Sequence, residues 1–454
     1  MNEDNKKRRL MEEENVSKSL LKLGIPTMIG MMTSALYNLV DTYFVGTLGT
    51  SQTAAVSAAY PLSILFLAIG LLFGTGGSSY LARLLGNRQI KKANQCFTTS
   101  VITAVMVSIG VTIIMLLILT PLLSVLGATS TMMPYAKAYA VPFIIGLVIN
   151  VFNITVNNMI AAEGATGFSM IAMLAGGITN MILDPVLILG CNMGVRGAAI
   201  ATLISRCVSL IFYVGYLVSG KSSFQFSIKN FKPESEMYTQ IFKIGLPMLC
   251  YQLLCSIALS ATNYCAKGYG DAVVAGIGVS NRILSLGSMM LIGFLKGFQP
   301  FVGFNYGAKK YDRVRNATRL AKIWTTAFCV IIGLAVIVFH KELIHAFTAA
   351  GDADMIRYGG INLILNAVTF MGLGFSMVYD FLFLGIGKAK EAGMISVTRQ
   401  GIFFLPLIFL LPMIFGVKGV LLAQPLADIL TYIMIVKMTY HKTFIPTRIC
   451  NGSI

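Results

Sequence analysis

The segment Lys22-Leu23-Gly24-Ile25-Pro26 opens the first long apolar stretch of the chain, and Lys243-Ile244-Gly245-Leu246-Pro247 opens a later one. The offset between the two glycines is 221 residues, close to half of the 454-residue chain. Further pairs at the same or nearly the same offset are Gly86 and Gly307, Gly164 and Gly385, Pro185 and Pro406, and Gly194-Val195-Arg196-Gly197 with Gly416-Val417-Lys418-Gly419. A similarity that persists at one offset indicates an internal repeat, so the chain consists of two similar halves.

The composition of the chain excludes a soluble globular protein. Hydrophobic residues make up 56% of the sequence and charged residues only 12%, too few charges to cover a surface in water. Apolar stretches of about 20 residues, each able to cross roughly 30 Å of hydrocarbon as a helix, recur from Leu23 to Tyr440. We count twelve of these stretches.

These stretches predict helices rather than a membrane β-barrel. Inside lipid every backbone polar group needs a partner within the protein, and the sequence lacks the strand-like alternation of a barrel. The predicted fold class is an all-α polytopic membrane protein, with twelve transmembrane helices in two pseudo-symmetric six-helix lobes.

The most polar interior stretch separates the two repeats. We assign residues 1–218 to an N-terminal lobe, 219–236 to a cytoplasmic linker and 237–454 to a C-terminal lobe. Because six spans is an even number, the lobes have the same orientation, with a central cavity between them and rocking of one against the other as the default mechanism. A monomer suffices for this architecture. Pro185 and Pro406 predict kinks in the fifth and eleventh spans, either static or able to bend.

Membrane topology explains the net charge of +17 better than nucleic-acid binding does. Basic residues gather in short loops after even-numbered spans, and such loops are typically cytoplasmic. Both termini are therefore predicted to be cytoplasmic in a multi-pass cell-membrane protein. The apolar run that follows the polar segment Met1 to Ser19 lacks a cleavage-type small-residue site, so we expect the first span to be retained. The loop residues are Arg83, Arg88, Lys91, Lys92, Lys221, Lys229, Lys232, Lys309, Lys310, Arg313, Arg315, Lys388 and Lys390.

Two acidic residues inside predicted spans indicate a functional site. A carboxylate near a helix centre costs roughly 2.5 to 3.5 kcal/mol on insertion scales, so Asp41 and Asp184 each need a partner or a role. Helical spacing places Tyr37 over Asp41 and Asn180 over Asp184. The predicted polar cluster of the first lobe consists of Tyr37, Asn38, Asp41, Asn157, Asn180, Asp184 and Thr202.

Three interpretations of this cluster are open. Two carboxylates in a confined, poorly solvated site can hold a proton, because burial and like-charge repulsion both disfavour ionisation. The oxygens of Asp41, Asn180, Asp184 and Thr202 can instead coordinate Na⁺, since hard cations prefer oxygen ligands. The third interpretation is a static hydrogen-bond network that fixes helix packing.

Other charged residues inside spans are harder to interpret. The repeat places Arg206 opposite Asp428 in the other lobe, and the two are possible partners, although equivalent sites in separate lobes need not meet. Glu163 and Lys296 lie near predicted cytoplasmic ends, where loop contacts or snorkelling explain them. The predicted wall of the substrate cavity, adaptable and mostly aromatic, consists of Tyr251, Phe298, Phe375, Tyr379 and Asp380.

The sequence shows no pattern of an enzyme or of a resident cofactor site. The eight cysteines lie mostly inside apolar spans without CxxC spacing, which favours buried thiols over zinc ligands or disulfides. An intramembrane enzyme would need a constellation such as HExxH, a Ser-His pair or an Asp-rich diphosphate motif, and none is present. We expect no cofactor besides a coupling ion.

Over essentially its whole length the sequence resembles the multidrug and toxic compound extrusion (MATE) transporters. Three motifs carry the resemblance: the repeated Gly24-Ile25-Pro26 and Gly245-Leu246-Pro247, the segment from Gly297 to Ala308 (GFQPFVGFNYGA), and Asn180-Met181-Ile182-Leu183-Asp184-Pro185. The resemblance implies a V-shaped twelve-helix antiporter in which inward cation flux drives drug export.

The resemblance also implies roles for particular residues. In the DinF-like branch the coupling site is built from a Tyr-Asn-x-x-Asp, an Asn, an Asn-x-x-x-Asp and a Thr, which here match the predicted cluster from Tyr37 to Thr202. Another branch uses a Glu and an Asp of the second lobe, where this chain has Cys255 and Phe375. The resemblance therefore implies coupling through the first lobe.

The predicted function is export of small amphipathic, often cationic, compounds, driven by H⁺ or Na⁺. The alternative is a lipid-linked precursor flippase of a related superfamily, which would present several cationic residues toward a pyrophosphate. The partners we expect are a small-molecule substrate and the lipid bilayer.

Overall fold

The computed structural model describes residues 3–126, 132–345 and 353–440. Within these ranges twelve helices are long and apolar enough to cross a membrane, which confirms the predicted fold class. In chain order they are α2 (Val16–Gly46), α3 (Thr50–Gly86), α4 (Ile90–Leu117), α6 (Met133–Ala162), α7 (Thr166–Pro185) with η1 (Val186–Gly190), α8 (Gly194–Val218), α9 (Ser235–Lys267), α10 (Asp271–Gly307), α11 (Tyr311–Val338), α13 (Ala353–Ile386), α14 (Ala389–Val397) with η3 (Thr398–Phe403) and α15 (Phe404–Phe415), and α16 (Val417–Tyr440). Short helices are α1 (Glu3–Glu12), α5 (Leu119–Val125), η2 (Ile228–Asn230) and α12 (His340–His345).

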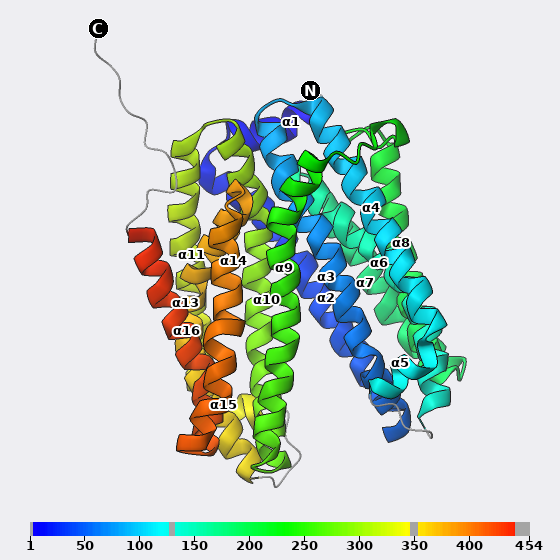
Figure 1. The fold of residues 1–454 in the computed structure, drawn as a ribbon, viewed down its shortest axis with the longest axis vertical. Helices are drawn as coiled ribbons and strands as arrows, with labels where there is room; N and C mark the ends of the chain where they lie inside the picture. Colours follow the sequence, from blue (N-terminus) through cyan, green and yellow to red (C-terminus); the bar gives the residue numbers. More distant parts are fainter. Residues whose placement is uncertain (1–2, 127–131, 346–352, 441–454) are drawn as a thin grey trace.

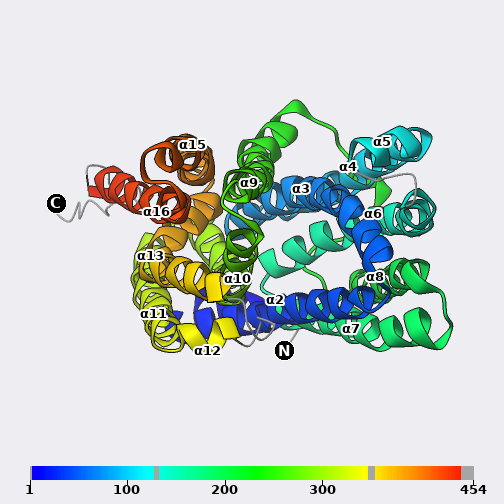
Figure 2. The same cartoon turned by 90° about the horizontal axis from the view of Figure 1, so that it is seen from below.

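The long helices form two groups that diverge toward the end opposite α1 (Figure 1). Seen from that opposite end, α2 to α8 lie on one side and α9 to α16 on the other (Figure 2). The two groups meet where α2 packs along α10 and where α3 packs along α9. The basic loops of the sequence lie at the α1 end, since α3 and α10 finish there and α4 and α11 begin there.

Glycines allow the backbones of the two halves to come very close at the α1 end. A Cβ added at Gly297 of α10 would lie 2.6 Å from the backbone nitrogen of Gly24 in α2, a distance that real Cβ atoms do not adopt. The repeat-related pair is Gly76 of α3 and Gly245 of α9, where a Cβ on Gly76 would lie 3.1 Å from the other nitrogen. The motifs that reveal the repeat therefore form the contact between its two copies.

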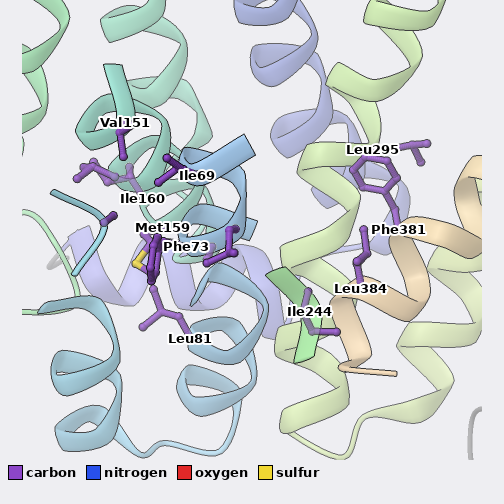
Figure 3. Close-up of a cluster of buried hydrophobic side chains, with 14 of the residues drawn as sticks. Ile69, Phe73, Leu81, Val151, Met159, Ile160, Ile244, Leu295, Phe381 and Leu384 are labelled. Atoms are coloured by element: carbon purple, nitrogen blue, oxygen red, sulfur yellow. The ribbon is translucent and has the colours of Figure 1, made fainter. Parts of the chain in front are cut away.

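One apolar cluster spans both halves at these crossings (Figure 3). In the first half, Phe73 and Leu81 of α3 are buried with Met159 of α6. In the second half, Leu295 of α10 is buried near Phe381 of α13. The two halves therefore share a continuous apolar core, and Phe73 of α3 meets Phe242 of α9 with ring centroids 5.9 Å apart.

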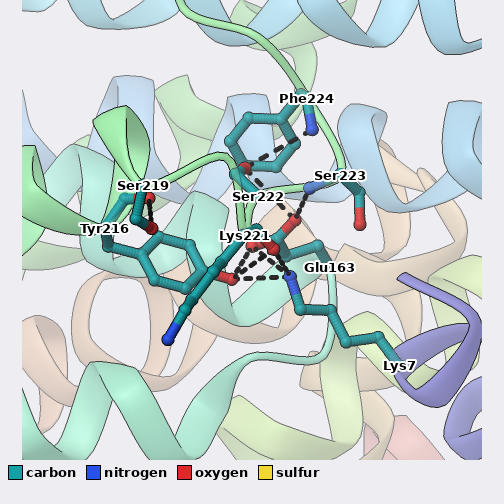
Figure 4. Close-up of polar contacts among 8 residues, drawn as sticks. All are labelled: Lys7, Glu163, Tyr216, Ser219, Lys221, Ser222, Ser223 and Phe224. Carbon is teal, nitrogen blue, oxygen red and sulfur yellow. Dashed lines mark hydrogen bonds and ion pairs between the residues drawn. The ribbon is translucent and has the colours of Figure 1, made fainter. Parts of the chain in front are cut away.

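Helix α1 is fixed to the first half by Lys7 (Figure 4). The Nζ atom of Lys7 lies 3.2 Å from Oε1 of Glu163 and donates to the hydroxyl of Tyr216 at 2.6 Å. Glu163 is buried and also accepts a hydrogen bond of 2.6 Å from the backbone nitrogen of Ser223. Loop contacts thus explain Glu163, as its predicted position near a cytoplasmic end suggested.

The last turn of α1 is fixed to the second half. The carbonyl of Met11 accepts hydrogen bonds from Nδ2 of Asn305 at 3.0 Å and from Nη2 of Arg313 at 3.2 Å. Glu12 forms an ion pair of 3.0 Å with Lys310. A single short helix therefore bridges the two halves at the end where they meet.

The connection between the halves packs against the first half. It runs from the end of α8 at Val218 to the start of α9 at Ser235. Phe224 is buried and stacks on Phe97 of α4 with ring centroids 4.3 Å apart. The backbone nitrogen of Lys232 donates to the hydroxyl of Thr99 at 3.1 Å, so this polar stretch has defined contacts.

The fifth and eleventh spans contain π-helical turns next to their prolines. Pro185 is the last residue of α7 and directly precedes η1, and Pro406 follows η3 by three residues. A π-turn changes the direction of the side chains that follow it and is frequent at functional sites. The proline positions were informative in the sequence, but the π-turns were not predicted.

Replacement of Gly297 by alanine tests the close crossing. We expect Gly297→Ala to lower the midpoint of thermal unfolding in detergent, because overpacking costs about 1–3 kcal/mol. Gly278, on the same helix, has open space around it, so Gly278→Ala is the matched control and should leave the midpoint unchanged or raise it. Equal midpoints for the two variants would contradict a tight contact at Gly297.

Candidate functional site

The two acids of the first half lie on neighbouring helices. Asp41 belongs to α2 and Asp184 to α7, and these helices are packed so closely that a Cβ on Gly177 would lie 2.7 Å from Cγ2 of Thr33. The carboxylates of Asp41 and Asp184 interact electrostatically. Nδ2 of Asn180 donates to Oδ1 of Asp184 at 3.2 Å. The structure therefore brings Tyr37, Asp41, Asn180 and Asp184 together.

Three buried oxygens of this cluster have no hydrogen-bond partner among the described residues: Oδ1 of Asp41, Oδ1 of Asn180 and Oδ2 of Asp184. Asp184 is fully buried and Asn180 nearly so. An unpaired buried oxygen costs about 1–3 kcal/mol, and more when it is charged. The donor set is chemically suited to a proton or to a hard monovalent cation, both of which bind to such oxygens.

The other predicted members of the cluster occupy different surroundings. Asn38 is exposed, and its Nδ2 donates to the carbonyl of Ser34 on its own helix at 2.8 Å. Oδ1 of Asn157 accepts hydrogen bonds from Ser169 and Tyr213, not from either acid. Thr202 lies one turn before Arg206 on α8.

Arg206 is the residue of this site whose role the sequence did not define. Its guanidinium lies 5.2 Å from the ring centroid of Phe143 and interacts electrostatically with Asp41 and Tyr139. Its Nη1 is buried with no hydrogen-bond partner in the described part of the chain. Arg206 does not meet Asp428, because Asp428 has a partner in its own half. The sequence left the roles of these two residues open, and the structure pairs Asp428 with Arg399.

The partner of Asp428 is Arg399, which lies in η3. Nε of Arg399 lies 2.8 Å from Oδ1 of Asp428, and Nε2 of Gln424 donates to the same oxygen at 2.9 Å. The pair lies on a cavity of about 290 Å³ between α9, α10, α13 and α16, which Cys255 also lines. In the second half, the negative charge of the buried Asp428 is therefore already balanced by the guanidinium of Arg399.

None of the five residues predicted for the substrate wall lines this cavity in the described structure. Phe298 is fully buried in the core, and Phe375 and Tyr379 pack against the core. Asp380 accepts a hydrogen bond of 3.3 Å from Ser396, and Tyr251 is half-buried. Contact of these residues with substrate remains a prediction.

Lys296 is not explained by snorkelling. It lies on α10 and lines a narrow cavity between the two halves, together with Asn157 and Gln299. The expectation of snorkelling or a loop contact was wrong for Lys296, because this side chain faces the first half. The position of a residue along a helix does not show toward which neighbour its side chain is directed.

Twelve membrane-spanning helices in two halves, with buried charged and polar side chains, are an architecture typical of membrane transporters. The family model described as MatE matches residues 26–186 and 247–410, so the chain belongs to this family of multidrug efflux transporters. This result confirms the resemblance noted in the sequence and makes the chain a multi-pass plasma-membrane protein.

Individual relatives are similar over nearly the whole chain. A multidrug export protein MepA of Staphylococcus haemolyticus is 26% identical over 92% of both chains. An outward-facing multidrug resistance MATE family transporter superposes with a TM-score of 0.88 at 27% identity, covering 94% of this chain and 95% of that one. A MOP superfamily transporter from Pyrococcus furiosus gives the same values.

Removal of Asp428 should destabilise the protein more than removal of the whole pair. Asp428→Asn leaves the guanidinium of Arg399 without its counter-charge, at a cost toward the lower end of about 3–5 kcal/mol, because the adjoining cavity admits water. The double variant Arg399→Met/Asp428→Leu carries no buried charge and should unfold closer to the parent temperature in detergent. A double variant less stable than Asp428→Asn would contradict this account.

Proposed function

We propose that the chain is a cation-coupled antiporter that exports small amphipathic drugs by alternating access, with H⁺ or Na⁺ bound between Asp41 and Asp184. The observation that carries this proposal is the group of three buried oxygens without partners in the described first half. A static network would satisfy its acceptors, whereas an ion-exchange site has to leave them available.

The charge balance of the site supports one monovalent cation. With both acids ionised, Asp41 and Asp184 carry two negative charges and Arg206 one positive charge, which leaves a single negative charge to be neutralised. A proton or Na⁺ supplies that charge, and its release restores an unpaired carboxylate in a low-dielectric interior. The site therefore has two charge states that can be linked to two arrangements of the helices.

The arrangement of the two halves supports alternating access. They touch through glycines at the α1 end and diverge at the other end, and a related solved structure is described as outward-facing. We assign the α1 end, with its basic loops, to the cytoplasm. Rocking about the glycine crossings then exposes the interior to one side at a time.

The proposal that the substrates are drugs rests on the relatives and on the apolar interior. The similar MepA protein is described as a multidrug export protein. The second-half cavity of about 290 Å³ combines apolar walls such as Phe370 and Leu373 with a few polar groups, the composition that suits amphipathic molecules.

Transport in proteoliposomes tests the coupling site. An imposed proton or sodium gradient should drive drug transport by the parent protein, and the effective gradient identifies the ion. Asp41→Asn and Asp184→Asn should each reduce gradient-driven transport to the level of protein-free liposomes while the protein remains folded and inserted. The reason is that an amide neither takes up a proton near neutral pH nor carries the negative charge that balances a bound cation.

The control is Asp312→Asn, which removes an exposed carboxylate at the start of α11 and should transport like the parent. Full gradient-driven transport by purified Asp41→Asn or Asp184→Asn would overturn the assignment. If neither gradient drives any drug in the parent, the antiport proposal itself fails.

A further inference from the structure

An apolar groove crosses the boundary between the two halves near the α1 end. The first half forms one wall with Leu21, Ile25 and Met28 of α2. The second half forms the other wall with α10 and α11, where Phe294 and Trp324 contact each other edge to face. The groove has a volume of about 230 Å³, and its lining is almost entirely hydrophobic.

This groove opens toward lipid. Leu21 and Ile25 are 42% and 41% exposed, and α2 and α11, both membrane spans, lie along the same edge of the molecule (Figure 2). An apolar groove left empty at this depth would lose the dispersion contacts of its walls. The apolar groups that surround a membrane span are acyl chains, and the groove has room for several methylene groups of one chain.

The position of Trp324 indicates how deep the groove lies. On α11, Arg319 and Lys322 precede this residue, and no charged residue follows it up to the end of the helix at Val338. Tryptophan is enriched where the hydrocarbon meets the headgroups. The groove therefore begins near the headgroups and continues into the hydrocarbon.

Two lysines lie at the headgroup end of the groove. Lys18 and Lys22 precede Leu21 and Ile25 on α2 at intervals of three residues, so all four belong to one face of the helix. Both lysines are exposed. Lys22 is paired with Glu14 at 2.9 Å, whereas Lys18 has no carboxylate within 4.0 Å in the described part of the chain. The excess positive charge at this level attracts anionic headgroups.

We propose that this groove binds an anionic phospholipid of the leaflet on the α1 side, with one acyl chain between α2 and α11 and the phosphate near Lys18 and Lys22. The walls belong to different halves, so a chain seated there contacts both halves at once. This lipid site goes beyond the proposed transport and does not depend on it.

Trp324 is the only tryptophan of the chain, so its fluorescence reports on the groove. The protein is placed in phosphatidylcholine bilayers that contain a small fraction of brominated lipid, because bromine on an acyl chain quenches a tryptophan that it contacts. At equal fractions, brominated phosphatidylglycerol should quench Trp324 more strongly than brominated phosphatidylcholine. We expect a preference of about 5- to 30-fold, the range for one or two lysines near a bilayer surface.

The variant Lys18→Gln/Lys22→Gln should abolish this preference, so that both brominated lipids quench Trp324 equally. Lys437→Gln removes an exposed lysine in the last turn of α16 and should keep the preference of the parent. The variant Trp324→Phe/Ile323→Trp moves the tryptophan to a neighbouring position whose side chain is 54% exposed. Its depth is nearly the same but its face of α11 differs, so the two lipids should quench it equally.

Four results would overturn the proposal. Equal quenching by the two lipids in the parent would show non-specific lipid contact, and no quenching by either would show that the groove excludes lipid. A preference that survives Lys18→Gln/Lys22→Gln would remove the headgroup from these lysines. The same preference for a tryptophan at position 323 would show a general attraction of anionic lipid to this surface. None of these measurements needs a drug or an ion gradient, so a failure of antiport leaves them valid.

Discussion

The approach of backbone to backbone at the glycine crossings is the constraint on which the rest of the structure depends. Gly24 with Gly297 and Gly76 with Gly245 leave no room for a side chain between the halves, so the helices touch at one end and must diverge beyond it. This divergence separates the interior of each half from the other. The close approach at the α1 end also encloses Lys296 and Gln299 in a cavity whose walls belong to both halves.

The two halves share a design but differ in how their buried charges are satisfied. In the second half, Asp428 has Arg399 and Gln424 as partners within 2.9 Å, which is the pattern of a structural ion pair. In the first half, Asp41 and Asp184 retain oxygens without partners among the described residues, and the guanidinium of Arg206 is present but not bonded to them. Duplication thus produced one half with a closed charge pair and one with an open site.

The apolar stretches of the sequence predicted the twelve spans. Helical spacing fixes which residues of one helix share a face, so it predicted that Tyr37 lies next to Asp41 and Asn180 next to Asp184. What depends on rotation between helices was not predictable. Lys296 faces the other half, and Asn157 bonds to Tyr213 instead of the acids. The π-turn η3, which carries Arg399, shifts the register of its span, so the repeat offset could not identify the partner of Asp428.

The bridge made by α1 has a consequence for how the protein is built. The carbonyl of Met11 is bonded by Asn305, which lies 294 residues later in the chain. During synthesis α1 can therefore contact Glu163 as soon as the fourth span has been made. Its contact with Asn305 forms only after the eighth span has been made. Docking of α1 onto α10 therefore requires that the first eight spans have been made, while the last four are still to come.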